Sequence, residues 1–248
     1  MTALLLKADW PAPAGIHTAV STRLGGVSAA PYASLNLGSH VADQPACVMQ
    51  NRERFRQLAA LPAEPCWLNQ THSTLCVDIE TTDFSASPPN ADAAFTRIPG
   101  QVATVLTADC LPVLFCNSAG TAVAAAHAGW RGLCDGVLEQ TLARFSPNDE
   151  LLVWLGPAIG PSAFEVGDDV RTAFIARQSA AEHAFIAVAG KPGKWLADLY
   201  LLARLRLQAT GVSQIYGGGL CTYTDQRRFY SYRRDGQTGR MASCIWLD

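Results

Sequence analysis

Four short apolar runs in the middle of the chain restrict the fold more than any other feature of the sequence. They are VATVLTADC (102–110), LPVLFCN (111–117), TAVAAAHAG (121–129) and LLVWLGPAIG (151–160). Each has about the length of a strand, is rich in Val, Leu and Ala, and is bordered by Gly, Pro or Asn, which is typical of strands buried on both faces. The sequence therefore predicts a central sheet built from these runs.

Apolar residues at helical spacing predict helices that cover this sheet. In one such segment, Val48, Phe55, Leu58 and Leu61 recur on one face while charged residues occupy the other. The expected helices span residues 45–61, 134–145, 168–177 and 195–210, and the remaining expected strands span 1–11, 212–217 and 242–247. This succession predicts a layered α+β fold with mixed sheets.

The composition fits one domain that spans residues 1–248. Hydrophobic residues make up 49% and charged residues 16% of the 248 positions, which is enough apolar material for one sizeable core. The segment SASPPN (85–90) is a clear break, but no internal repeat, long charged run or low-complexity linker divides the chain.

The charge and the length of the apolar runs exclude two classes of partner. The formal net charge is −2, so no global positive field exists to hold nucleic acid or an anionic membrane surface. The apolar runs fall far short of the roughly 20 residues that a membrane helix needs. The first residues lack the basic head and cleavage site of a secretion signal. We therefore expect a soluble, cytosolic protein whose eight cysteines are reduced.

Two histidines and one cysteine stand where a fold of this kind presents reactive groups. His127 and Cys110 each lie at the end of an apolar run, just before a loop marked by Gly or Pro, and His72 lies among polar neighbours in LNQTHST. They are suited to a three-ligand metal centre for zinc, or tolerably for copper, with a fourth position open to an acidic water. They are equally compatible with a metal-free pair in which His127 lowers the pKa of the Cys110 thiol for nucleophilic attack.

Arginines beside glycines are candidate anion-binding groups. Arg23 and Arg131 have glycines close by, and flexible glycines let backbone N–H groups approach an oxyanion while a guanidinium offers a planar fork. Arg131 is equally compatible with a surface turn, and Asn36 with either a loop cap or contact to a sugar hydroxyl. Arg233 and Arg234, which precede Asp-Gly, indicate a solvated turn.

Six segments, in order along the chain, resemble the successive sequence blocks of the YfiH/laccase-domain family. They are STRLGGVSAAPYASLNLGSHV (21–41), LNQTHS (68–73), TADCLPVL (107–114), AAHAGWRG (125–132), LGPAIGPSAFEVG (155–167) and SYRRDGQTGRMAS (231–243). The resemblance covers nearly the whole chain. One block departs from the pattern, because the Q-V-H-G of many relatives is QTHS here, which keeps the histidine.

The resemblance implies an α/β/β/α sandwich with mixed sheets, similar to the cysteine-hydrolase domain of a bacterial toxin. It also implies a metal centre, with zinc as the first expectation and copper as the alternative, whose ligands are His72, Cys110 and His127. The T-R-x-G-G block belongs to the substrate pocket in this family, which places Arg23 there. Asn36 and Arg131 complete the expected set of substrate-binding residues.

The resemblance implies an enzyme that acts on a small molecule. The first expectation is a zinc-dependent purine nucleoside phosphorylase, which converts adenosine, inosine or guanosine and phosphate to the base and ribose 1-phosphate, and which also deaminates adenosine. Asp109 or Glu165 would then have to move protons. The alternatives are an amidase that edits peptidoglycan-precursor peptides, a copper-dependent polyphenol oxidase, and a non-enzymatic binding module. The oxidase is disfavoured because the chain has five histidines and no HxH pair. The sequence does not indicate an oligomeric state.

Overall fold

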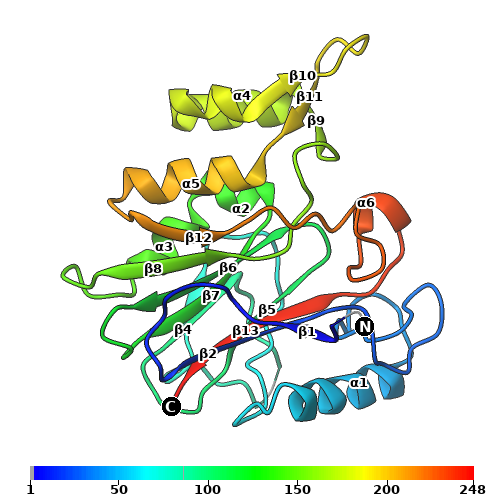
Figure 1. Cartoon of the computed structure of the whole chain (residues 1–248), viewed down its shortest axis with the longest axis vertical. Coiled ribbons are helices and arrows are strands. Elements are labelled where there is room, and N and C mark those ends of the chain that lie inside the picture. The colour runs from blue at the N-terminus through cyan, green and yellow to red at the C-terminus, as the bar shows by residue number, and fades with distance from the viewer. Residues whose placement is uncertain (1–2, 86) are drawn as a thin grey trace.

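A six-stranded mixed sheet is one of the two sheets at the centre of the fold (Figure 1). The computed structural model describes residues 3–85 and 87–248, so that residues 1 and 2 of the expected first strand and residue 86 of the expected break lie outside the described residues. The strand order is β12-β8-β6-β7-β4-β3, in which the outer pairs β12/β8 and β3/β4 are parallel and the inner pairs are antiparallel. The strands are β3 (Cys76–Asp78), β4 (Ala93–Thr96), β6 (Leu111–Asn117), β7 (Val123–Ala128), β8 (Leu151–Leu155) and β12 (Gln214–Gly217).

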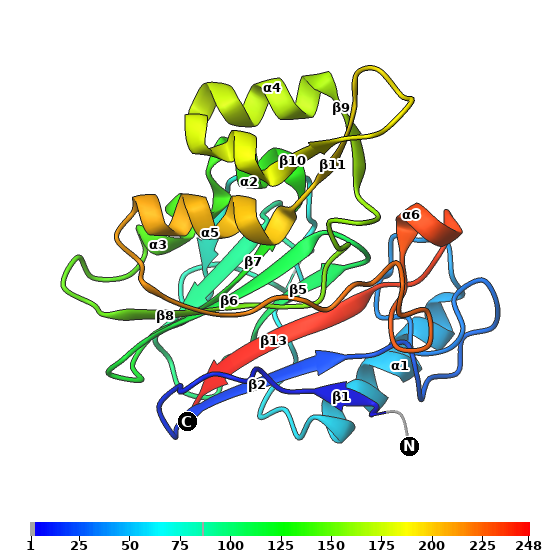
Figure 2. The ribbon, with the colours of Figure 1, turned by 45° about the horizontal axis from the view of Figure 1, so that its top comes forward.

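A four-stranded antiparallel sheet packs against the first one. Its order is β1-β2-β13-β5, and Figure 2 shows β2 and β13 crossing in front of the six-stranded sheet. The strands are β1 (Leu5–Leu6), β2 (Ile16–Ser21), β5 (Ala103–Thr107) and β13 (Met241–Leu247). Leu114 and Trp154 from the first sheet meet Val105 and Ile245 from the second in one buried cluster. This shared core joins the two sheets face to face.

Helices cover both outer faces. The helices α2 (Trp130–Asp135), α3 (Val137–Leu142) and α5 (Leu199–Ala209) pack on the six-stranded sheet, and α1 (Pro45–Leu58) packs on the four-stranded sheet through the fully buried Phe55. The layer order is therefore α/β/β/α, which confirms the predicted fold class. No helix in residues 3–85 or 87–248 has the length and apolar character needed to span a bilayer.

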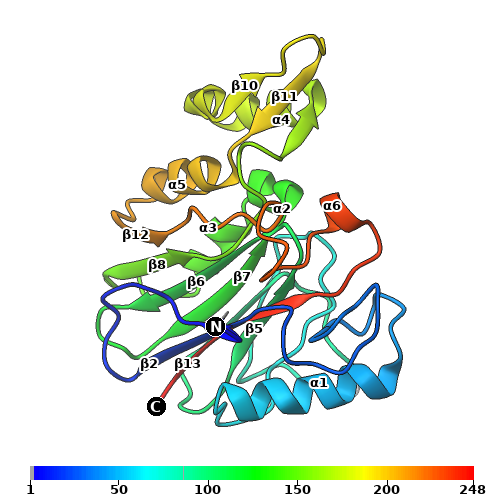
Figure 3. The same ribbon diagram turned by 45° about the vertical axis from the view of Figure 1, so that its right-hand side comes forward.

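A small third sheet projects from one end of the sandwich (Figure 3). Its order is β10-β11-β9, all antiparallel, and it carries one α-helix and one 3-10 helix. The elements are β9 (Glu165–Gly167), α4 (Asp168–Arg177), η1 (Ser179–Ala184), β10 (Phe185–Ala187) and β11 (Lys194–Ala197), while the single turn of helix α6 (Tyr232–Asp235) lies apart, beside the end of β13.

The four apolar runs form the strands β5, β6, β7 and β8, as predicted, but β5 belongs to the four-stranded sheet, so the single central sheet expected from all four was wrong. The expected helix over 45–61 ends at Leu58, the expected first strand is formed in the described residues only by Leu5–Leu6, and the expected strand over 212–217 begins at Gln214. Two further helices also differ in their bounds. The expected helix over 195–210 begins only at Leu199, because residues 194–197 pair with β9 and β10 and the Asp198 side chain caps the helix that follows. The expected helix over 134–145 is two short helices, because Gly136 between them has a left-handed φ of 109°.

Candidate metal centre

The strand register brings Cys110 and His127 together. Cys110 occupies the turn between β5 and β6, and His127 stands opposite Pro112 on the neighbouring strand β7. His72 arrives on the loop before β3, and its Nε2 lies 3.9 Å from Sγ of Cys110. One ligand atom from each residue lies within 4.8 Å of the others. The three residues singled out in the sequence therefore form a group that can hold a metal ion.

A buried carboxylate holds both histidines of this group in place. Asp92 immediately precedes β4, the neighbour of β7, and its Oδ1 accepts a hydrogen bond of 2.8 Å from Nδ1 of His127. The same carboxylate accepts hydrogen bonds from the backbone N–H groups of Thr71, His72 and Ser73, at 3.1, 3.0 and 2.6 Å, and one from the Ser73 hydroxyl. This contact fixes Nδ1 of His127 as a donor, which leaves Nε2 free for a metal.

The backbone near the centre is built for close approach. Gln70 joins the His72 loop to β5 by two hydrogen bonds with the backbone of Leu106, at 2.7 and 2.8 Å. A Cβ at position 129 would lie 2.6 Å from the His72 ring and 3.1 Å from the sulfur of Cys110, so only glycine fits there. Steric crowding therefore explains why position 129, two residues after His127, is a glycine.

The charges of the group stabilise a thiolate. Burial raises the pKa of Cys110, but the charges and hydrogen bonds of His127 and His72 outweigh burial and lower it to about 6. Burial lowers the pKa of His127, but the Cys110 thiolate and Asp92 outweigh burial and raise it to about 9. Burial likewise raises the pKa of Asp92, and the hydrogen bonds from His127 and Ser73 bring it down to about 2. Near neutral pH the metal-free group therefore carries a thiolate beside an imidazolium.

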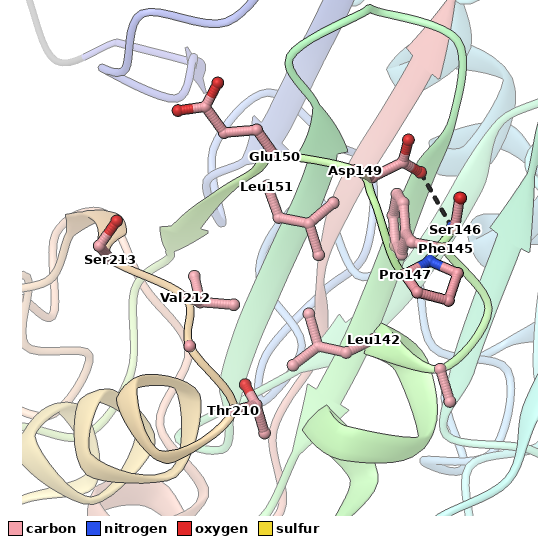
Figure 4. Close-up of a pocket in the computed structure, with 12 residues that line it drawn as sticks. Leu142, Phe145, Ser146, Pro147, Asp149, Glu150, Leu151, Thr210, Val212 and Ser213 are labelled. Carbon is pink, nitrogen blue, oxygen red and sulfur yellow. Dashed lines mark hydrogen bonds between the residues drawn. The ribbon is translucent and has the colours of Figure 1, made fainter.

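The three residues open onto a cavity of about 390 Å³. Its wall mixes polar and apolar side chains from both sheets and from the loops at their ends. Besides the three candidate ligands, it consists of His40, Gln70, Leu106, Thr107, Ala108, Tyr232 and Arg240. A hollow of about 540 Å³ at the far end of α3, drawn in Figure 4, is larger but shares no residue with this wall. Its two carboxylates already accept hydrogen bonds from Ser146 and Gln214, so the smaller cavity is the better candidate site.

The expected substrate residues lie elsewhere. Arg23 donates to the carbonyl groups of Ala33 and Gln226, and Arg131 is exposed with its guanidinium 4.4 Å from the centre of the Trp130 ring. In the part of the chain that the structure describes, the cavity wall includes neither arginine. Substrate contact by these two arginines stays a prediction that the geometry does not favour.

Asn36 has the contacts of a loop cap. Its side chain is fully buried, donates to the carbonyl of Gly38 and to Asp43, and accepts from the N–H groups of Gly38 and Arg240. Of the two interpretations that the sequence allowed, these contacts favour the structural one. Through the Arg240 backbone, Asn36 also helps to set a residue of the cavity wall.

Asp109 and Glu165 are poorly placed to move protons. Asp109 is only 8% exposed, and its two oxygens accept from the Thr222 hydroxyl (2.6 Å) and the N–H of Arg233 (2.7 Å). Glu165 pairs with Lys191 on the third sheet. Asp109 instead connects the Cys110 turn to the C-terminal segment that carries Tyr232, and its φ of 95° shows that this turn is strained.

The sequence analysis missed several residues of the site. The predicted solvated turn was wrong for Arg234, which is mostly buried and donates to the carbonyls of Thr222, Tyr223 and Phe229. Arg240 and His40 were not identified, although both line the cavity. The signal that could have found Asp92 is a single carboxylate inside the small apolar run NADAAF.

The pKa of Cys110 predicts an unusual pattern of alkylation in metal-free protein. Because the thiolate predominates above a pKa of about 6, the iodoacetamide rate at Cys110 should level off above about pH 7 and fall below pH 6. Cys66, whose pKa burial raises to about 11, should react far more slowly. Peptide mapping of the alkylated protein measures both rates. A Cys110 rate that keeps rising between pH 8 and pH 9 would contradict the thiolate.

The Asp109 contacts predict a difference between two substitutions. In Asp109→Asn, the amide oxygen can accept from Arg233 while the amide nitrogen donates to the Thr222 hydroxyl, and Asn tolerates a positive φ. Asp109→Ala loses both contacts, so it should lower the free energy of unfolding by about 2–4 kcal/mol, against less than half of that for Asn. Urea denaturation measures the difference. Equal losses would show that the hydrogen bonds do not matter.

Sequence and structure comparisons extend over nearly the whole chain. Residues 17–248 match the family of multi-copper polyphenol oxidoreductase laccases. "Purine nucleoside phosphorylase PA4543" of Pseudomonas aeruginosa and "Purine nucleoside phosphorylase YfiH" of Escherichia coli K12 are each 54% identical to this chain, over 98% of both chains in each case.

Two solved structures share the fold. Protein NMB0706 of Neisseria meningitidis is 52% identical with a TM-score of 0.94, over 99% of this chain and 100% of its own. YlmD of Geobacillus stearothermophilus is 31% identical with a TM-score of 0.85, over 100% of this chain and 97% of its own. The chain therefore belongs to the multi-copper polyphenol oxidoreductase laccase family, and YfiH of Escherichia coli is among its relatives.

Proposed function

We propose that this protein is a metal-dependent purine nucleoside phosphorylase, which splits adenosine, inosine or guanosine with phosphate into the base and ribose 1-phosphate. One observation carries the proposal: the wall of a single cavity holds both a His-Cys-His group and the guanidinium of Arg240. Phosphorolysis needs an anion site beside the group that activates the substrate. The names of relatives that are 54% identical support purine nucleosides as the substrate class.

Zinc is the metal that the donor set fits best. A tetrahedral zinc ion at about 2.0 Å from nitrogen and about 2.3 Å from sulfur holds these atoms about 3.5 Å apart. The observed separation of 3.9 Å between Nε2 of His72 and Sγ of Cys110 is close to that value. Asp92 behind His127 is the carboxylate that commonly orients a histidine ligand. A bound zinc ion would supply Lewis acidity at its open fourth position.

Arg240 is the group best placed to bind phosphate. Its Nη1 donates to the carbonyls of Thr238 and Gly239, while its Nε and Nη2 donate no hydrogen bond within residues 3–85 and 87–248. The side chain lines the cavity, and burial lowers its pKa. An arginine side chain nevertheless stays protonated in proteins. A partly desolvated guanidinium with free N–H groups is a strong partner for an oxyanion.

We also propose deamination of adenosine to inosine as a second activity of the same cavity. Water would form a bond to C6 of adenine, from which ammonia leaves, whereas phosphate forms a bond to C1′ of the ribose. His72, Cys110 and His127 would hold the metal that makes this water acidic. This reaction needs no anion site. Deamination should therefore proceed without phosphate, whereas phosphorolysis should require it, and this difference separates the two activities.

Metal content and turnover together test the metal-dependent phosphorylase. Wild type should carry close to one zinc ion per chain and form ribose 1-phosphate from inosine only when phosphate is present. Cys110→Ala should lose the metal. It should also reduce turnover by more than the roughly 10- to 100-fold loss that follows when a residue hydrogen-bonded to a metal ligand is replaced. The control is Cys47→Ala on the outer helix α1, which should keep both. Full activity in Cys110→Ala would overturn the proposal.

Substitution of the two arginines tests the anion site. Arg240→Gln should raise the phosphate KM roughly 10- to 150-fold, because a charge-assisted contact contributes about 1.5–3 kcal/mol. Arg23→Ala, which removes contacts to backbone carbonyls, should lower stability and leave the phosphate KM close to that of wild type. Initial rates at several phosphate concentrations measure both. A raised phosphate KM in Arg23→Ala, with an unchanged one in Arg240→Gln, would show that Arg23 and not Arg240 binds phosphate.

A further inference from the structure

The proposed phosphorolysis must move one proton, and the following inference rests on that proposed function. The C1′–O bond forms to a phosphate oxygen, the C1′–N9 bond breaks, and the electron pair of that bond leaves with the purine. Hydrogen phosphate gives up its proton when it becomes an ester, and a neutral purine takes up one proton as it departs. The atoms balance without a further reactant, provided that one group carries the proton.

The carboxylates near the cavity do not suit this task. Both oxygens of Asp109 accept hydrogen bonds from protein groups, and Asp92 is fully buried behind His127. The described part of the cavity wall contains no Asp or Glu. Apart from the candidate metal ligands, its titratable side chains are His40, Tyr232 and Arg240. A histidine is the one of these whose ordinary pKa suits proton transfer near neutral pH.

His40 lies where the two reactants, the nucleoside and phosphate, would meet. It lines the cavity of the candidate metal centre and two adjoining hollows of about 310 and 410 Å³, and it is the one described residue common to all three. Its ring makes no hydrogen bond to any part of the chain that the structure describes, so both ring nitrogens can serve a ligand.

The backbone on each side of His40 is fixed. Asn36 binds both the N–H and the carbonyl of Gly38, and the Tyr32 hydroxyl donates to the carbonyl of Val41. The loop therefore holds the backbone that carries the ring in place, although His40 itself is exposed. A positioned ring with free nitrogens meets the geometric requirement for an acid–base group.

The charges around His40 favour its neutral form. Burial lowers its pKa, and so do the positive charges of Arg240 and of Arg52 on α1. In metal-free protein, the protonated His127 on β7 lowers it further. Tyr232 of α6 faces the same cavity. A neutral imidazole can accept a proton at one nitrogen and then donate one.

We propose that His40 accepts the proton of hydrogen phosphate and delivers it to the departing purine. The hollow next to Arg240 and the one beside Arg52 both meet the cavity at this ring. His40 is thus a catalytic residue that contacts both reactants.

The test compares two substrates in His40→Ala. With inosine, kcat should fall by about 10²- to 10⁴-fold, the usual contribution of general acid–base catalysis. With 7-methylinosine, the cationic purine leaves without taking up a proton, and the proton of hydrogen phosphate can pass to water once the C1′–O bond has formed. The loss should therefore be less than tenfold. Added imidazole should restore part of the turnover of inosine. The matched control is His183→Ala, an exposed histidine of the third sheet's 3-10 helix, which should behave as wild type with both substrates.

The outcomes distinguish this inference from the proposed function. Failure of metal-loaded wild type to form ribose 1-phosphate from either nucleoside overturns the proposed function and the role of His40 with it. If wild type is active and His40→Ala loses both substrates equally, without rescue by imidazole, His40 does not transfer the proton. Zinc content and the urea midpoint of His40→Ala should match wild type, and a loss of either would also overturn the assignment.

Discussion

The buried carboxylate of Asp92 is the interaction on which the candidate site depends. A carboxylate that is withdrawn from water costs free energy unless hydrogen bonds replace the lost hydration. Asp92 receives them from His127 on β7 and from three consecutive residues of the His72 loop. One side chain therefore joins strand β7 to the His72 loop, and it sets the ring orientation of one histidine while it places the backbone of the other.

The antiparallel pairs β4/β7 and β6/β7 make this contact possible. Their register sets Ala93 opposite Ala126 and Pro112 opposite His127, so that Asp92 and Cys110 approach His127 from neighbouring strands. His72 and Asp109 both have positive φ values, at 61° and 95°. Such strain persists only where surrounding contacts hold it, and the carboxylate contacts of Asp92 and Asp109 supply them. The buried carboxylates therefore hold the strained backbone that positions His72 and Cys110.

The parts of this structure that could be predicted from sequence are those encoded locally. Buried strands are recognisable as apolar runs, and the three candidate ligands lie at the ends of such runs or in a family block. Arg23 beside its glycines has a local pattern that suits an anion, but contacts with distant carbonyls decide where its guanidinium lies. His40 and Arg240 are 200 residues apart and share a cavity wall only through the fold. Each lies in a family block, 21–41 or 231–243, but nothing within its block distinguishes it as a cavity residue. That residues 1–248 form one domain stays a prediction.

The positive groups of the cavity explain how a chain with a net charge of −2 can select an anion. Arg240 and His40 share the cavity wall with the candidate ligands, Arg52 lines the adjoining hollow, and the described wall itself includes no carboxylate. In a partly desolvated site, nearby charges act more strongly than they do in water, while distant surface charges are screened beyond about 8–10 Å at physiological salt. The local arrangement would therefore determine the preference for phosphate that we propose. The positive charge of Arg240 that would attract phosphate also lowers the pKa of His40, so that in our proposal anion binding and proton transfer depend on one electrostatic environment.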